Sequence, residues 1–296
     1  MQHESFLLGL AGFPLEHSFS PRMHNAALNS LGLSGEYRLF PIPPCPNPTD
    51  QIARLLDQVR RGEVHGLNVT IPYKQSIMMQ VDEYTPEAQA IGAINTVFRK
   101  GNKLIGTNTD AAGFLADLSR FFPVEKWSLN PHNLSALVLG AGGSARAVVY
   151  ALASSGWQVT VAARRIEQAE ALCLDLQSYQ ENLPPIKSTN LGTTLVLPEP
   201  LPILIVNTTP VGMHPHEAAS PWPANLPFPS GAMIYDLIYN PADTTLMKSA
   251  RIAGLATTNG LGMLLEQAVL AFEQWFDRPA PRSVMHQALL DSYTDF

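Results

Sequence analysis

The segment SALVLGAGGSARAVVYALASSGWQVTVAARR, residues 135–165, decides the fold. Its apolar run at 135–139 predicts a buried strand, the glycines predict a tight turn, and the rest predicts a helix to about Ser155 and a strand at 158–162. This order is typical of a dinucleotide-binding fold, in which backbone N–H groups at the helix start approach a pyrophosphate. The alternative, a turn that only packs the helix on the strand, is disfavoured by the flanking elements. The turn matches the pattern G-x-G-x-x-A with Gly140, Ala141, Gly142, Gly143, Ser144 and Ala145.

The end of the second predicted strand indicates which dinucleotide binds. An NAD-binding chain usually carries an Asp or Glu there, which accepts a hydrogen bond from the ribose 2′-hydroxyl. Here the strand expected at 158–162 is followed by Ala163, Arg164 and Arg165, with no carboxylate among them. Two guanidinium groups pair well with a 2′-phosphate, whereas two solvated cations at a helix start are mildly unfavourable. The sequence therefore favours NADP.

Strand and helix signals alternate along the rest of the chain, which predicts an α/β protein. Ser20 followed by Pro21 is a strong pairing for an N-cap and the first helical residue, Thr85-Pro86 is a second helix start, and Lys100-Gly101-Asn102 predicts a hairpin turn. The further expected elements are strands at 6–10, 65–70, 97–98, 203–206 and 232–235, helices at 20–31 and 50–62, and two C-terminal helices separated by Pro279 and Pro281.

The chain is long enough for two domains. We expect junctions near Ala111 and Gly260. Residues 1–111 and the C-terminal helices at 261–296 then form an α/β substrate domain, and residues 112–260 form a Rossmann-type NADP-binding domain.

Composition and charge exclude several classes of protein. With 46% apolar and 15% charged residues the chain is globular. No uncharged apolar run reaches the roughly 18 residues of a membrane span and the N-terminus lacks a secretory leader, so we expect a cytoplasmic protein. The net charge of −6 argues against nucleic-acid binding. Cys45 and Cys173 are too far apart for a CxxC metal site and suggest no disulfide framework.

Further motifs follow one another along the chain outside the glycine turn. They are GFPLEHSFSP at 12–21, NVTIPYK at 68–74, GAINT at 92–96, GTNTDAAG at 106–113, NTT at 207–209, YDLIYNP at 235–241 and GLGMLLEQAVLAFEQW at 260–275. Together with the glycine turn they resemble the shikimate dehydrogenase family over nearly the whole sequence. The resemblance implies a two-domain oxidoreductase that uses NADPH to reduce 3-dehydroshikimate to shikimate, in the biosynthesis of chorismate and aromatic amino acids.

The resemblance implies that Lys74 is the catalytic lysine and that Asp110 is its partner. Hydride transfer to a ketone creates an alkoxide, which needs a proton donor within about 3 Å, and a lysine ammonium can supply that proton. An adjacent carboxylate fixes the ammonium and can hydrogen-bond the reacting hydroxyl. Taken alone, the lysine would be interpreted as a solvated side chain and the aspartate as a helix cap.

The family's substrate contacts fall on polar, uncharged side chains. Ser18 and Ser20 are implied to bind the substrate carboxylate, although Ser20 is also the expected N-cap, so both roles stay open for it. Asn95 could instead only cap a strand end, and Gln267 could expose its amide to solvent. The implied contacts to the ring hydroxyls and across the substrate are Thr70, Asn95, Tyr239 and Gln267.

The implied cofactor contacts include Leu237, Gly260 and Thr208 besides the glycine turn and the two arginines. The family's usual Asn-Arg-Thr loop reads Ala163-Arg164-Arg165 here, and Gln168 replaces a second arginine. The strictness of the preference for NADP over NAD therefore stays open.

No metal site is expected. His17 and His24 lack further ligands at a fitting spacing and are interpreted as structural. The alternatives are a quinate dehydrogenase, which can use NAD, and a sensor of the same fold without activity. Ser18 and Ser20 favour shikimate over quinate, and the intact Lys74 and Asp110 argue against a sensor. The sequence is compatible with a monomer or a homodimer, with a small molecule as its partner.

Overall fold

The structure is a computed structural model that describes residues 5–122, 134–179, 183–192 and 195–294. It is an α/β protein, as expected, with two six-stranded sheets. The chain divides into two compact units: Met1–Gly113 with Leu265–Phe296, and Phe114–Leu264. The division falls within two helices, α4 (Asp110–Phe121) and α9 (Leu261–Phe276).

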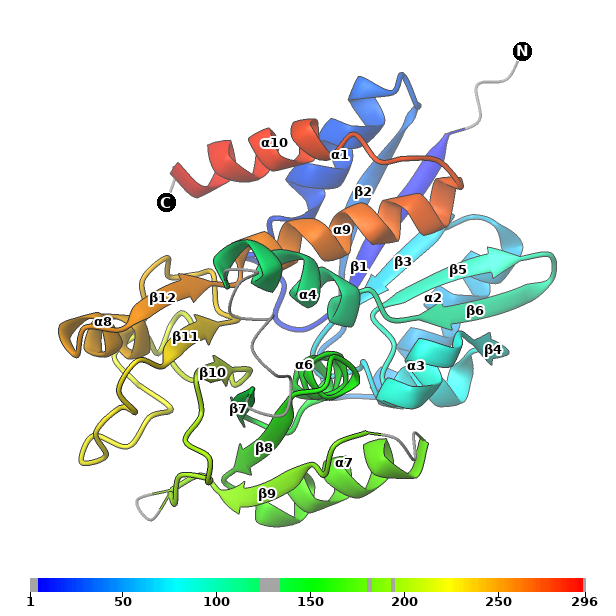
Figure 1. The fold of residues 1–296 in the computed structure, drawn as a ribbon. Coiled ribbons are helices and arrows are strands. Elements are labelled where there is room, and N and C mark those ends of the chain that lie inside the picture. The colour runs from blue at the N-terminus through cyan, green and yellow to red at the C-terminus, as the bar shows by residue number, and fades with distance from the viewer. Residues whose placement is uncertain (1–4, 123–133, 180–182, 193–194, 295–296) are drawn as a thin grey trace. The chain divides into compact units, whose positions relative to one another are not determined.

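The first unit contains a mixed sheet of order β2-β1-β3-β5-β6-β4. Strands β1, β2 and β3 are parallel, and β5 is antiparallel to both β3 and β6. Helix α1 packs on α10, and the two helices lie side by side in Figure 1. The strands are β1 (Phe6–Gly12), β2 (Gly35–Pro41), β3 (Gly66–Val69), β4 (Glu83–Tyr84), β5 (Thr96–Lys100) and β6 (Lys103–Thr107). The helices are α1 (Ser20–Ser30), α2 (Pro48–Arg61), the 3-10 turn η1 (Ser76–Gln80), α3 (Pro86–Ile91) and α10 (Arg282–Thr294), with parts of α4 and α9.

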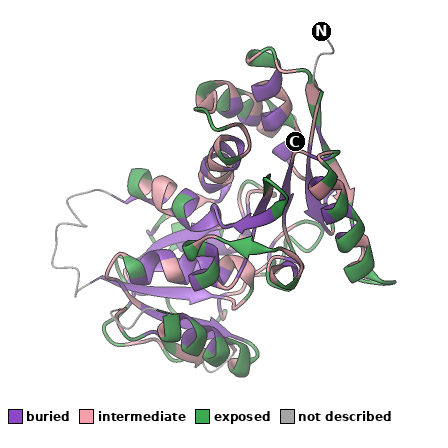
Figure 2. Ribbon diagram, turned by 90° about the vertical axis from the view of Figure 1, so that its right-hand side faces the viewer, coloured by how far each residue is buried: buried purple, intermediate pink, exposed green. Residues whose placement is uncertain are grey.

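The second unit contains a fully parallel sheet of order β12-β11-β10-β7-β8-β9. The strand order reverses between β7 and β10, as it does at the ligand site of Rossmann-type sheets. Buried residues fill the four central strands of this sheet, and Figure 2 shows exposed residues on the outer sides of the helices. The strands are β7 (Ser135–Leu139), β8 (Gln158–Ala163), β9 (Lys187–Asn190), β10 (Leu204–Asn207), β11 (Met233–Asp236) and β12 (Ala256–Asn259); the helices are α6 (Gly143–Ser154), α7 (Ile166–Tyr179) and α8 (Thr245–Ile252).

Local signals account for several element boundaries. Thr85 caps α3 by accepting a hydrogen bond from Ala88 N, which confirms the predicted helix start. Gly62 ends α2 with a φ of 76°, where glycine carries no steric penalty. Gly101, with a φ of 61°, forms the predicted hairpin turn between β5 and β6.

One predicted cap is wrong. Helix α1 begins at Ser20 itself, and the N-cap position is Phe19, whose φ of −84° and ψ of −6° are already helical. The Phe19 side chain makes no capping hydrogen bond. Instead, Ser18 Oγ accepts a hydrogen bond from Ser20 N at 3.3 Å. The backbone therefore turns into the helix one residue earlier than the Ser-Pro pair suggested.

In the part of the chain that the structure describes, every helix is too short or too polar to cross a membrane.

Candidate active site

Most of the predicted substrate residues of the first unit follow strand ends at a single edge of its sheet. Strands β1, β3 and β6 run in one direction and β5 runs in the other, so the carboxyl ends of the first three lie beside the amino end of β5. Thr70 follows β3, Asn95 precedes β5, and Asp110 lies shortly after β6. Side chains far apart in sequence therefore meet at this edge.

Lys74 and Asp110 form a shielded ion pair. Lys74 Nζ lies 2.7 Å from Asp110 Oδ2, and the two side chains are 13% and 6% exposed. The backbone of Lys74 is fixed as well, because its carbonyl accepts a hydrogen bond from Ile94 N at 2.7 Å. The predicted catalytic pair is thus in direct contact, although 36 positions separate its members.

Asp110 is the first residue of α4, where a carboxylate interacts favourably with the helix dipole. Asn108 Oδ1 accepts a hydrogen bond from Asp110 N at 3.0 Å and orders this helix start. Asn95 Nδ2 donates to Asp110 Oδ1 at 2.9 Å. Each carboxylate oxygen therefore has a separate donor, which holds the carboxylate in one orientation.

Ser18 and Ser20 lie on the segment between β1 and α1. Ser18 is half-buried and Ser20 is buried. The bond from Ser20 N to Ser18 Oγ gives Ser18 a structural role at the helix start, which sequence reasoning had assigned to Ser20. Ser18 Oγ still has a proton to donate to a ligand, because it acts as the acceptor in this bond.

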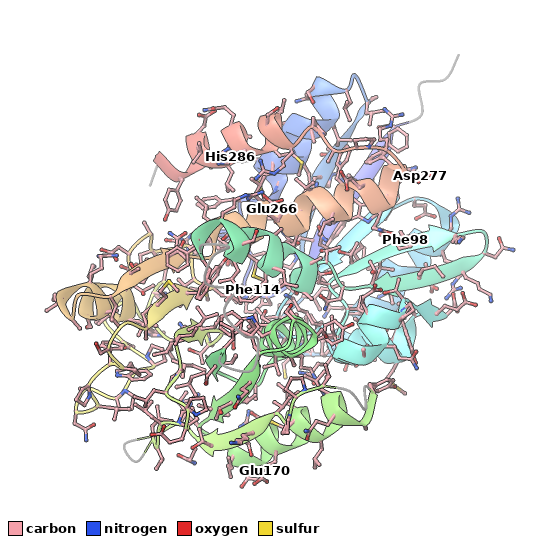
Figure 3. The ribbon with its side chains drawn as sticks, in the orientation of Figure 1. Phe98, Phe114, Glu170, Glu266, Asp277 and His286 are labelled. Carbon is pink, nitrogen blue, oxygen red and sulfur yellow. The ribbon has the colours of Figure 1, made fainter. Side chains whose placement is uncertain are left out.

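The remaining predicted substrate residues are half-buried. Thr70 N donates to Ala11 O, which fixes Thr70 beside β1. Gln267 lies on α9. A side-chain carbon added at Gly113 on α4 would lie 2.8 Å from Gln267 N, so these two helices cross closely at this point. Figure 3 labels the neighbouring Glu266 on α9, which pairs with Arg282 at the start of α10. Tyr239 belongs to the second unit, and burial raises its pKa to about 12.

His24 is a fully buried aromatic residue of the first unit. Its ring stacks on Tyr37, with ring centroids 4.4 Å apart. Burial lowers its pKa to about 3, so it is neutral at pH 7.

The predicted cofactor residues of the second unit follow the ends of five neighbouring parallel strands. Because all strands of this sheet are parallel, these residues lie along one edge of it. Ligands of open α/β sheets bind at this edge. Gly140 follows β7, Arg164 follows β8, Thr208 follows β10, Leu237 follows β11 and Gly260 follows β12.

The glycine turn leaves room for a phosphate group. Gly140 has a φ of 112°, and a side-chain carbon added there would lie 2.6 Å from Thr208 Oγ1. Thr208 is itself fixed, because its hydroxyl donates to Leu139 O at 2.7 Å. A carbon added at Gly142 would meet nothing within 4 Å, so there is open space over the first turn of α6. That turn carries backbone N–H groups without helical acceptors, which fit a pyrophosphate.

Arg164 and Arg165 are exposed between β8 and α7. The structure gives their guanidinium groups no ion-pair partner among the described residues. Their donors are therefore free for an anion next to the glycine turn, which fits a 2′-phosphate.

Leu237 and Gly260 form a tight backbone contact. A side-chain carbon added at Gly260 would lie 2.1 Å from Leu237 O, so only glycine fits there. Leu237 N also donates to Asn207 O. The backbone that carries Leu237 is held between two neighbouring segments.

Sequence reasoning missed a buried aspartate at the same edge. Asp236 accepts hydrogen bonds from Asn207 Nδ2 at 2.9 Å, Thr244 Oγ1 at 2.8 Å and Ile238 N at 3.1 Å. Burial raises its pKa to about 6, although these donors act in the opposite direction. The signal was its place in the YDLIYNP motif, directly after an apolar strand.

The parallel sheet, the glycine turn and the strand-end residues place the chain in the class of two-unit α/β proteins with a Rossmann-type dinucleotide unit. Models described as the shikimate dehydrogenase substrate binding domain and the shikimate 5'-dehydrogenase C-terminal domain match residues 10–97 and 260–290. The chain is 38% identical to the shikimate dehydrogenase (NADP(+)) of Carboxydothermus hydrogenoformans over 97% of both chains. The chain belongs to the shikimate dehydrogenase family.

Solved structures agree with this assignment. The shikimate 5-dehydrogenase of Thermus thermophilus, in complex with NADP(H) and shikimate, is 36% identical with a TM-score of 0.79, over 97% of this chain and 99% of that chain. A quinate dehydrogenase from Corynebacterium glutamicum, in complex with NAD, is 30% identical with a TM-score of 0.80, over 97% of this chain and 99% of that chain.

Proposed function

We propose that the chain catalyses the reversible, NADPH-dependent reduction of 3-dehydroshikimate to shikimate. The observation that carries this proposal is the ion pair between Lys74 and Asp110, at 2.7 Å and largely shielded from water. The similarity to named shikimate dehydrogenases along almost the full chain supports the choice of substrate.

Lys74 serves as the proton donor of the reduction. Bound NADPH supplies the hydride that adds to the ketone carbon. The carbonyl oxygen gains negative charge as its double bond breaks, and the Lys74 ammonium donates a proton to it. The lysine amine then takes a proton from solvent, and in the reverse direction it acts as the base. Asp110 holds Lys74 Nζ in place throughout.

The substrate is held by neutral donors and acceptors. Ser18 and Ser20 bind its carboxylate, Thr70, Asn95 and Gln267 bind its hydroxyl groups, and Tyr239 also contacts it. Polar, uncharged side chains suit a polyhydroxylated ring because each can both donate and accept. The half-buried or buried position of these side chains supports the proposal.

The cofactor is held by the second unit. The glycine turn Gly140 to Ser144 and the start of α6 bind the pyrophosphate, and Arg164 and Arg165 bind the 2′-phosphate of NADP. Thr208, Leu237 and Gly260 line the remaining part of the site. The exposed arginine pair and the open space over Gly142 support this assignment.

We further propose residues 1–111 with 261–296 as the substrate-binding domain, residues 112–260 as the NADP-binding domain, and a cytoplasmic location. The close agreement of the two compact units with this division supports the domain proposal.

Initial rates test the function. NADP reduction is followed by absorbance with shikimate or quinate, and each substrate is repeated with NAD. We expect rapid reduction only with shikimate and NADP. A higher kcat/KM with quinate and NAD would identify a quinate dehydrogenase instead. Calorimetric binding of shikimate without any turnover would identify a sensor.

A further inference from the structure

A row of buried hydrogen bonds leads from β2 toward the lysine–aspartate pair. Tyr37 Oη lies 2.8 Å from Asn68 Oδ1, Asn68 Nδ2 lies 3.0 Å from Thr96 Oγ1, and Thr96 Oγ1 lies 3.0 Å from Asn95 Oδ1. All four side chains are at most 5% exposed. Water therefore does not compete for these bonds, and each unmade bond would be costly.

The number of available protons fixes the direction of each bond. The Asn95 carbonyl can only accept, so Asn68 directs its NH2 group to Asn95 O and Thr96 Oγ1, and its own carbonyl oxygen accepts from the Tyr37 phenol. Asn68 Nδ2 lies 3.2 Å from Asn95 O. Thr96 Oγ1 accepts from Asn68 and donates its single proton to Asn95 Oδ1.

The row ends by orienting the amide of Asn95. Its Oδ1 accepts from Thr96 Oγ1 and from Thr109 N, the latter at 2.8 Å. Its Nδ2 is therefore directed at Asp110 Oδ1, 2.9 Å away. A flipped amide would place one oxygen against another at Asp110 and an N–H group against the N–H of Thr109.

We propose that Thr96 and Tyr37 are positioning residues for the dehydrogenase reaction. Through Asn68 and Asn95 they hold the Asp110 carboxylate so that its second oxygen faces Lys74. This inference rests on the proposed function. It assigns a role to Thr96, which the GAINT motif contains without an expected role, and to Tyr37, which lies outside the motifs.

The neighbouring strand offers a matched control. Thr107 on β6 is paired in register with Thr96 on β5. It is also buried, but its hydroxyl bonds Thr85 Oγ1 at 3.1 Å, not Asn95. The substitution Thr107→Val therefore removes a comparable hydroxyl from the same sheet and leaves every side-chain hydrogen bond of the row in place.

The test compares Thr96→Val, Thr96→Ser and Thr107→Val. We expect Thr96→Val to lower kcat about tenfold, because it removes the buried hydroxyl that bonds both Asn68 and Asn95, with the KM for NADP unchanged. The solvent deuterium isotope effect on kcat should rise, because proton transfer from a misaligned pair becomes slower. Thr96→Ser should restore both values, since serine keeps the hydroxyl, and Thr107→Val should behave like the wild type. Tyr37 lies two bonds further along the row than Thr96, and Tyr37→Phe should lower kcat by about threefold. This variant tests the same row if Thr96→Val fails to fold.

Two results would overturn the inference while the proposed function stands: full kcat in Thr96→Val, or an equal loss in Thr107→Val. If the wild type itself has no activity, the proposed function fails and the row is tested by NMR. The side-chain NH2 signals of 15N-asparagine-labelled protein should then shift or broaden in Thr96→Val and not in Thr107→Val. Unchanged signals in both variants would contradict the inference.

Discussion

At the scale of single residues, the site of the first unit depends on an ion pair that is shielded from water. An exposed lysine–carboxylate pair contributes little, because water and salt weaken it and both side chains lose freedom. Lys74 and Asp110 are mostly shielded, and a third side chain, Asn95, holds the carboxylate from the other side. The pair is thereby ordered before the substrate arrives, which reduces the reorganisation needed during reaction.

The substitution Lys74→Ala removes the proposed proton donor. We expect kcat to fall by at least about a hundredfold, the lower range for a positioned general acid, with the dissociation constant for NADPH nearly unchanged. Steady-state rates and fluorescence titration with NADPH measure the two quantities. Lys103→Ala, which removes an exposed lysine paired with Glu83, is the control and should keep the wild-type rate. Normal turnover with lost NADPH affinity would contradict the assignment.

The double substitution Arg164→Ala with Arg165→Ala removes the proposed partners of the 2′-phosphate. The KM for NADP should rise by about tenfold or more, since charge-assisted hydrogen bonds are worth roughly 1.5–3 kcal/mol. The kcat/KM with NAD, which lacks this phosphate, should stay the same. Initial rates with NADP and with NAD measure both quantities. An equal loss of kcat/KM with NAD would assign the arginines to another role.

At the scale of elements, the second sheet brings the proposed cofactor residues to one edge because its strands are parallel. Residues that directly follow β7, β8, β10, β11 and β12 end at one edge, although the chain between them runs through helices and loops. Asp236 lies buried at this edge. It accepts hydrogen bonds from Asn207 at the end of β10 and from Thr244 at the N-cap of α8. One buried carboxylate therefore fixes two of the turns that carry cofactor residues.

The pKa of Asp236 predicts a pH dependence of stability. Its value in the folded state, about 6, lies above the ordinary 3.8, so the folded state binds the proton more tightly. The resulting contribution to the free energy of unfolding is fully present below about pH 4 and is lost as the pH rises through 6. Its size is about 3 kcal/mol for the shift of two pKa units.

Urea unfolding of the wild type and of Asp236→Asn between pH 4 and 7 measures this contribution. The stability of the wild type relative to the variant should decrease as the pH rises. A difference between the two proteins that is constant with pH would show that Asp236 does not titrate in this range.

At the scale of the whole molecule, the two proposed ligands bind to separately built sites, one in each compact unit for most of their residues. Ligands that bind only the folded state raise its stability by an amount set by their concentration and affinity. The stabilisation caused by each ligand can therefore be measured separately with substitutions confined to one unit.

We expect NADP or shikimate at a hundred times its dissociation constant to stabilise the chain by about 2.7 kcal/mol each. Both should raise Tm by several degrees in differential scanning fluorimetry. In the double arginine variant the shift caused by NADP should shrink, while the shift caused by shikimate should persist. Loss of both Tm shifts in this variant would indicate a general defect in folding. Quinate serves as the comparison ligand, and it should raise Tm less than shikimate does.

Local sequence signals determined the glycine turn, the cap at Thr85, the hairpin at Gly101 and most apolar strands, because each depends on the backbone preferences or burial of neighbouring residues. They gave no indication of β9 and β12, whose sequences KSTN and ATTN are polar. The Ser20 cap was predicted wrongly, because Phe19 packs in a buried, helical position that the Ser-Pro pair does not reveal.

The sequence by itself thus determined the fold class and the family, and it predicted the residues of both proposed sites. Only the tertiary structure decided which atoms meet: that Asn95 directs its NH2 group at Asp110, that Thr96 and Tyr37 lie behind it, and that the Gly260 backbone touches Leu237. The physical reason is that, apart from the bond between the sequence neighbours Thr96 and Asn95, these contacts join residues separated by many positions. They therefore follow from strand order and register and not from any local preference. Hydrogen-bond direction likewise follows from the complete set of neighbours around each buried group.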